Sequence, residues 1–139
     1  MNRLNTMSLT ILALCAFLGS LCTITSPIAA EEKEYLTAYI VVTVPEGTPD
    51  VFITGNLEFF GPWWADKVIM HKDANRRIYQ MEVPKYFRMQ YKFTLGDWKH
   101  EAIKKNGRKY KNFKMKVTKN NQVFQHTVDD WSGEWKKAQ

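Results

Sequence analysis

Few residues of this chain carry groups that commonly act in catalysis, and their spacing assembles no familiar catalytic set. Ser132 is the only serine after residue 30, and both cysteines lie before that position. The histidines are far apart and show no spacing typical of a metal site; they are His71, His100 and His126. A serine hydrolase needs a hydroxyl activated by a base, and zinc sites use cysteine and histidine at short fixed spacings. We therefore expect no enzyme and no cofactor.

Aromatic side chains are much more numerous than catalytic ones. The chain contains 8 Phe, 6 Tyr and 5 Trp, and four of these side chains fall in one short loop bounded by glycine and proline. They are Phe59, Phe60, Trp63 and Trp64. Aromatic residues of small β-proteins are mostly buried, and four are too many to face solvent together. We expect Phe60 and one tryptophan to be buried and the other tryptophan to be exposed, with Trp63 favoured as the exposed one.

A basic run is the third notable group. Residues 99–119 contain nine lysines and arginines and a single acid, Glu101, in a chain of formal charge +6. One interpretation is a patch that binds a polyanion, such as an acidic polysaccharide. The other is a solvated face, because strand alternation turns Lys114 and Lys116 outward in any case.

The first 30 residues differ in composition from the remainder. They contain one base, no acid and an apolar stretch, and the charged residues begin at Glu31. A basic start, a short apolar stretch and small residues before a polar onset are typical of a secretory signal peptide. We expect cleavage of residues 1–30, with an uncleaved anchor as the alternative, and a secreted or periplasmic protein without a membrane span in its mature chain. Export makes nucleic acid an unfavoured partner.

Period-two alternation of apolar and polar side chains positions these residues on strands, and helical periodicity is absent. Alternating segments separated by turn residues recur about every ten residues. They are 35–44, 51–54, 67–71, 78–83, 89–95, 98–103, 113–117 and 123–128. This pattern predicts a single all-β domain at 31–131, as a sandwich or small barrel, followed by a polar tail at 132–139.

Three ordered motifs resemble a known family. Residues 55–63 read Gly-Asn-Leu-Glu-Phe-Phe-Gly-Pro-Trp with Lys67 four positions later, residues 91–98 read Tyr-Lys-Phe-Thr-Leu-Gly-Asp-Trp, and Asn112 precedes a closing strand that ends at Trp131. This order resembles the starch-binding modules, family 20 of the carbohydrate-binding modules, and their immunoglobulin-like bacterial relatives. The resemblance implies an immunoglobulin-like antiparallel β-sandwich of seven to eight short strands.

The resemblance also implies a binding site for carbohydrate. The family's main site uses a tryptophan of the first motif, the lysine of Tyr-Lys-Phe, the tryptophan after it and an asparagine beyond. Here an extra tryptophan follows the first, and the usual Trp-Glu pair reads Trp-Lys, which leaves Glu101 as the substitute. The implied carbohydrate-binding residues are Trp63, Trp64, Lys92, Trp98, Glu101 and Asn112.

Elementary chemistry fits this assignment. An indole offers a flat apolar surface that matches the C–H face of a pyranose and leaves the hydroxyl rim free for hydrogen bonds. We expect non-catalytic binding of a polysaccharide or oligosaccharide, with an α-glucan favoured, at an affinity on the order of micromolar to millimolar. The alternative is a structural or interaction module of the cell envelope, whose basic face at Lys99–Lys119 docks an anionic polymer or a protein. Considered singly, Trp98 has the alternative of capping the sandwich and Lys92 that of a solvated lysine.

Overall fold

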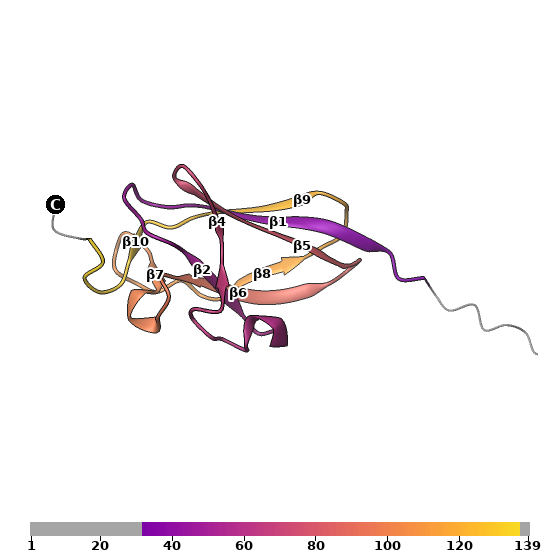
Figure 1. Ribbon diagram of the computed structural model, residues 1–139, viewed down its shortest axis with the longest axis horizontal. Coiled ribbons are helices and arrows are strands. Elements are labelled where there is room, and N and C mark those ends of the chain that lie inside the picture. Colours follow the sequence, from indigo (N-terminus) through magenta and orange to yellow (C-terminus); the bar gives the residue numbers. More distant parts are fainter. Residues whose placement is uncertain (1–31, 137–139) are drawn as a thin grey trace, which may run out of the picture. The chain divides into compact units, whose positions relative to one another are not determined.

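The computed structural model describes residues 32–136, so the predicted signal peptide and the last three residues lie outside the described part (Figure 1). Within it, β1 (Tyr35–Thr43) shows why the sequence forms strands. Its side chains alternate strictly, and every second one, from Leu36 to Val42, is buried. In this range no helix is long and apolar enough to cross a membrane.

Two four-stranded sheets face each other as the layers of an all-β sandwich, which confirms the predicted fold class (Figure 1). The first, here the β1 sheet, has the order β4-β5-β1-β9, with β4 at His71–Asp73, β5 at Arg76–Pro84 and β9 at Gln122–Thr127. The second, here the β6 sheet, has the order β3-β2-β6-β8, with β3 at Val68–Ile69, β2 at Phe52–Gly55, β6 at Arg88–Thr94 and β8 at Phe113–Lys116. A small third sheet pairs β7 (Ala102–Ile103) with β10 (Asp130–Trp131).

One strand pair departs from the purely antiparallel arrangement that was expected. β1 pairs antiparallel with β5 over nine residues but parallel with β9. The chain leaves β8 in one sheet and enters β9 in the other, so β9 arrives beside β1 running in the same direction. Alternation along a strand does not encode the direction of its neighbour.

Two predicted strands are wrong in their extent. The segment 67–71 is two short strands, β3 and β4, which belong to different sheets and are separated by the buried Met70. The segment 98–103 begins as a 3-10 turn, η2 (Trp98–His100), before β7. The Asp97 carboxylate accepts hydrogen bonds from the backbone N–H groups of Lys99 and His100, which caps this turn and delays the strand.

The core between the sheets is mainly aromatic and branched aliphatic. Phe60, at the end of the 3-10 turn η1 (Glu58–Phe60), is fully buried, as predicted. Trp131 is also buried, and its indole Nε1–H donates to Thr48 Oγ1 at 3.2 Å. The start of the predicted tail packs on the sandwich as well: the Ser132 hydroxyl donates to Lys99 O, and Trp135 contacts the core.

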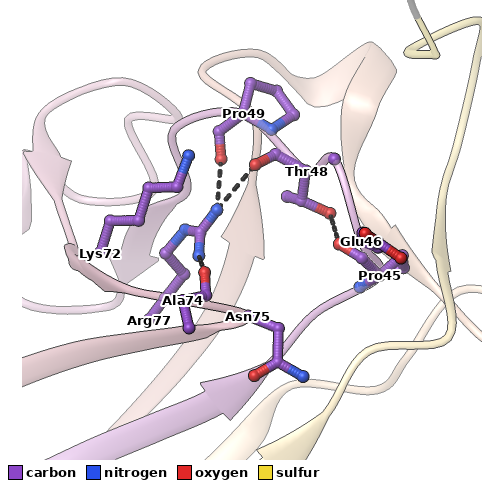
Figure 2. A pocket seen from close by; sticks show the side chains of 9 residues that line it. Pro45, Glu46, Thr48, Pro49, Lys72, Ala74, Asn75 and Arg77 are labelled. Carbon is purple, nitrogen blue, oxygen red and sulfur yellow. Dashed lines mark hydrogen bonds between the residues drawn. The ribbon is translucent and has the colours of Figure 1, made fainter.

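A buried arginine ties two loops together at one end of the β1 sheet. Arg77 on β5 is 1% exposed, and its guanidinium donates to Ala74 O at 3.0 Å, Thr48 O at 2.7 Å and Pro49 O at 3.1 Å (Figure 2). These carbonyls belong to the β4–β5 turn and to the loop that precedes β2. Desolvation lowers the pKa of Arg77, but its high ordinary value keeps it charged.

A histidine lies among aromatic rings where the sandwich edges β8 and β9 meet. The His126 ring is 4.4 Å from that of Phe113, and its Nε2 shares a hydrogen bond of 2.6 Å with the Tyr91 hydroxyl. Burial raises the pKa of Tyr91, so the phenol stays protonated, and burial lowers the pKa of His126. The neutral imidazole is therefore the form that fits this cluster.

We expect the protein to lose stability as the pH falls from 7 through about 6.5 because of this histidine. Its folded-state pKa lies below the unfolded value of about 6.5, so the unfolded chain binds more protons and acid favours unfolding. Urea unfolding across this range should show the loss in the wild type and in His71→Phe, which changes an exposed histidine, but not in His126→Phe. An unchanged slope in His126→Phe would assign the pH dependence to other groups.

Candidate functional site

The site residues implied by the sequence lie on the outer face of the β6 sheet and on its loops. Along β6 the buried side chains of Met89, Tyr91 and Phe93 face the core, so Gln90 and Lys92 point to the other side of the sheet. Figure 1 shows the two 3-10 turns, η1 in purple and η2 in orange, on the side of this sheet turned away from β1. The strand and the turns together form one face.

The loop after η1 crosses this face and is fastened at two points. The backbone N–H of Trp63 donates to Gly55 O at 2.8 Å, and the Thr94 hydroxyl donates to Ala65 O at 2.6 Å. Gly55 lies on β2 and Thr94 on β6, so the segment between these two bonds runs over both strands. Thr94 is fully buried under it although it belongs to the outer face.

The exposed tryptophan of this loop is Trp64. Its side chain is 62% exposed, whereas Trp63 is only half-buried, so the favoured assignment of Trp63 as the outward residue is wrong. Trp63 has a φ of +62°, a left-handed conformation that is costly for a bulky residue. No sequence pattern reveals this conformation.

The Trp64 ring is held in place on one side. Gly61 has a φ of +57°, and a Cβ added there would lie 2.7 Å from the Trp64 ring, so only glycine lets the indole pack this closely. Lys67 Nζ lies 5.4 Å from the ring centroid, within the range of a cation–π contact. The indole is thus an exposed flat surface with a fixed orientation.

Trp98 provides a second exposed indole on the same sheet's loops. It is 41% exposed and stands at the first position of η2, directly after Asp97. His100 Nδ1 lies 2.9 Å from the Asp97 carboxylate, and this hydrogen bond is the main reason why the pKa of Asp97 is lowered. The capped turn fixes the backbone that presents Trp98.

Lys92 does not stand free in solvent but belongs to a three-residue charge cluster with Glu101 and Lys109. Glu101 is 3% exposed; Lys92 Nζ donates to its Oε1, and Lys109 Nζ lies 2.8 Å from its Oε2. Burial raises the pKa of Glu101, but the hydrogen bonds from Lys109 and Lys92 outweigh it and hold the pKa below its usual value. Glu101 therefore accepts hydrogen bonds and orients Lys92, and it is not a proton donor.

Sequence reasoning missed the part of Lys109 in this cluster. Lys109 belongs to the basic run in the sequence, but only the β-bridge between Ile103 and Lys109 brings its side chain back to Glu101. Asn112 lies at the start of β8, where its Nδ2 donates to Gln90 Oε1 at 3.1 Å. The structure thus joins Lys92 to Glu101 directly and ties Asn112 to the same strand, β6.

This arrangement can hold a polar ligand with flat apolar surfaces. Two exposed indoles, the half-buried amide of Asn112 and the oriented ammonium group of Lys92 surround one sheet, and an ammonium group that has one partner keeps further donors. Across residues 32–136 no group of three His, Cys, Asp or Glu side chains has an arrangement that suits a metal ion.

Comparison with known proteins gives likeness in fold alone. No family model matches the sequence, and no curated protein does. Among solved structures, a glycoside hydrolase family 15 glucoamylase from Hypocrea jecorina matches 73% of this chain with a TM-score of 0.50 and 14% identity. A gamma-CGTase from alkalophilic Bacillus clarkii matches 69% with a TM-score of 0.47 and 17% identity. The match spans only 18% of the glucoamylase chain and 15% of the CGTase chain. This chain therefore shares its fold with a small part of the glucoamylase.

Proposed function

We propose that this protein is an exported, non-catalytic carbohydrate-binding domain with an α-glucan as its favoured ligand. The observation that carries the proposal is the Trp64 indole, which is 62% exposed yet held by Gly61 and Lys67, together with the second exposed indole, Trp98, on another loop of the β6 sheet. An exposed aromatic ring with a fixed orientation loses little entropy when it stacks on a ligand. This chain shares its fold with part of a glucoamylase, an enzyme named for its action on a glucan, and this likeness supports the ligand class.

In this proposal each candidate residue has a distinct part. The indoles of Trp64 and Trp98 stack on the C–H faces of sugar rings, and Trp63 shapes the loop. Lys92 and the Asn112 amide donate to hydroxyl groups at the rims of those rings. Glu101 holds Lys92 in position and is a positioning residue.

We expect Trp64→Ala to weaken binding of an amylose-type oligosaccharide by about tenfold, which corresponds to about 1.4 kcal/mol. The variant removes the stacking surface and the packing on Gly61 but no side chain of the core, so its melting temperature should stay close to that of the wild type. Isothermal titration calorimetry measures the affinity. Tyr35→Ala is the matched control, because Tyr35 is equally exposed, at 62%, but lies on β1 in the other sheet. Equal affinities of Trp64→Ala and the wild type would exclude stacking on this ring.

The alternative, a basic face at Lys99–Lys119 that docks an anionic polymer or an envelope protein, is favoured only by Lys114 and Lys116, which line one groove. The bases of this run do not form a single patch. Lys109 belongs to the Glu101 cluster and Lys104 lies over the Tyr110 ring, whereas Lys114 and Lys116 line a groove on the β6 sheet. Lys109 thus reaches the proposed sugar site through Glu101, and Lys114 and Lys116 lie on the same sheet as that site.

A further inference from the structure

A groove of about 460 Å³ runs along β6 and β8 on the outer face of the β6 sheet. Arg88, Lys114 and Lys116 line it together with the polar side chains of Asn56 and Gln90. All three basic side chains are exposed, and none of the described residues that line the groove is acidic. A concave surface with one sign of charge concentrates ligands of the opposite sign.

The strand register places these charges close together. Arg88 lies directly opposite Lys116, and Gln90 lies opposite Lys114. Like charges in directly opposed positions destabilise a sheet. Within residues 32–136, none of the three basic side chains forms an ion pair or a side-chain hydrogen bond, whereas the nearby Lys85 pairs with Glu34 at 2.8 Å. The fold therefore carries an uncompensated positive charge at a small cost in stability.

An exposed tyrosine adjoins the same groove. Tyr86 is 59% exposed and has a φ of +67°, a left-handed conformation that is strained for such a residue. Lys116 Nζ lies 5.3 Å from its ring centroid and Lys85 Nζ lies 5.7 Å from it. Its backbone N–H donates to Val117 O at 2.7 Å, which fixes the strained residue at the end of β8. The groove therefore joins a flat apolar ring to a row of cations.

The groove is also connected to the proposed sugar site. Gln90, which lines the groove, accepts the hydrogen bond from Asn112, and the Asn56 side chain accepts one from the backbone N–H of Gln90 at 2.8 Å. Asn56 in turn immediately precedes the loop that carries Trp64. A single extended ligand on this face would therefore meet both surfaces.

We propose that this groove binds an acidic polysaccharide, whose carboxylate or sulfate groups contact Arg88, Lys114 and Lys116 while a sugar ring stacks on Tyr86. This inference rests on the proposed carbohydrate-binding function and adds to the neutral α-glucan a second ligand class, one that also gains charge attraction from the groove. An acidic polysaccharide repeats an anionic group beside an apolar ring face, which is the combination that the groove and Tyr86 present. The hydrogen-bonding amides of Asn56 and Gln90 suit the hydroxyl groups between them.

The test compares an oligosaccharide of polygalacturonate with a neutral amylose-type oligosaccharide of the same length. At low salt we expect the wild type to bind polygalacturonate about tenfold more tightly. The triple variant Arg88→Gln/Lys114→Gln/Lys116→Gln should lose this advantage and lower the slope of log affinity against log salt by about one for each charge removed. Its affinity for the neutral oligosaccharide should not change.

Two further variants distinguish an effect of the groove from an effect of net charge and from an effect on folding. Lys72→Gln/Lys105→Gln/Lys136→Gln removes the same charge from exposed lysines outside the groove and should leave binding nearly unchanged. Tyr86→Asn removes the ring with a residue that tolerates positive φ, so we expect weaker polygalacturonate binding, by about threefold to tenfold, with an unaltered salt slope.

Each other outcome contradicts a defined part of the account. An equal loss in the control triple variant, or equal binding of polyglutamate or single-stranded DNA, would overturn the inference in favour of generic attraction of anions. Tight binding of the neutral oligosaccharide without any preference for polygalacturonate would overturn the inference and leave the proposed function intact. Binding of neither oligosaccharide would overturn both.

Discussion

Replacing Arg77 by methionine should lower the free energy of unfolding by about 3–5 kcal/mol. Methionine fills part of the space of the aliphatic stem but donates no hydrogen bond. The carbonyl groups of Ala74, Thr48 and Pro49 would then lose their partner; the bond to Thr48 is buried and the other two are part-buried. Figure 2 shows how the single guanidinium reaches both loops at once. A buried carbonyl without a donor costs more than the hydrogen bond itself contributed.

The neighbouring arginine provides the matched control for this prediction. Arg76 is exposed and pairs with Asp73 at the surface, where an ion pair contributes about 0–1 kcal/mol. Urea unfolding followed by circular dichroism should therefore separate the two variants by at least about 2 kcal/mol. Similar stabilities of Arg77→Met and Arg76→Met would show that the buried guanidinium does not hold the loops together.

The second large effect should come from Glu101. We expect Glu101→Gln to lose about 2–4 kcal/mol of stability, because it leaves Lys92, whose side chain is only 17% exposed, without its anionic partner. The folded-state pKa of Glu101 is lowered, so its stabilisation is present above the unfolded value of 4.5 and is lost as the pH falls through the folded pKa. The variant should therefore lack this part of the acid-induced loss.

A double-mutant cycle with Lys92→Met tests whether the two side chains are coupled. Removing both charges should restore part of the stability that Glu101→Gln loses, because no unpaired Lys92 remains in the sheet face. Glu34→Gln serves as the control, since its partner Lys85 and Glu34 itself are both exposed and their ion pair contributes little. Strictly additive effects of the two substitutions in the cycle would contradict a direct interaction.

The sequence predicted the sandwich because one face of each long strand is buried. Buried and exposed side chains alternate along β1 and β6 because one face of each strand packs on the core. This alternation can be read from neighbouring residues in the sequence. The signal failed where a contact at longer range decided the outcome. Met70 is buried between two short strands in different sheets, and the side chain of Asp97 turns the next residues into a 3-10 turn. Neither effect changes the period of the pattern.

The candidate site was predictable in its residue types but less so in its geometry. The sequence does not distinguish two adjacent tryptophans, and the structure exposes Trp64 while Trp63, at a φ of +62°, is half-buried. The Glu101 cluster needs the loop at Lys109 to fold back, which is a tertiary event. The cationic groove combines Arg88 with residues of β8 that are distant in the sequence, so strand register alone creates it.

The most direct test of the carbohydrate-binding face is a titration followed by NMR signals of the indole N–H groups. Adding an amylose-type oligosaccharide should shift the signals of the exposed Trp64 and Trp98, while the signal of Trp131, 2% exposed in the core, stays in place as an internal control. Unmoved signals of Trp64 and Trp98 at millimolar concentrations of both neutral and acidic oligosaccharides would contradict the proposal that this face binds carbohydrate.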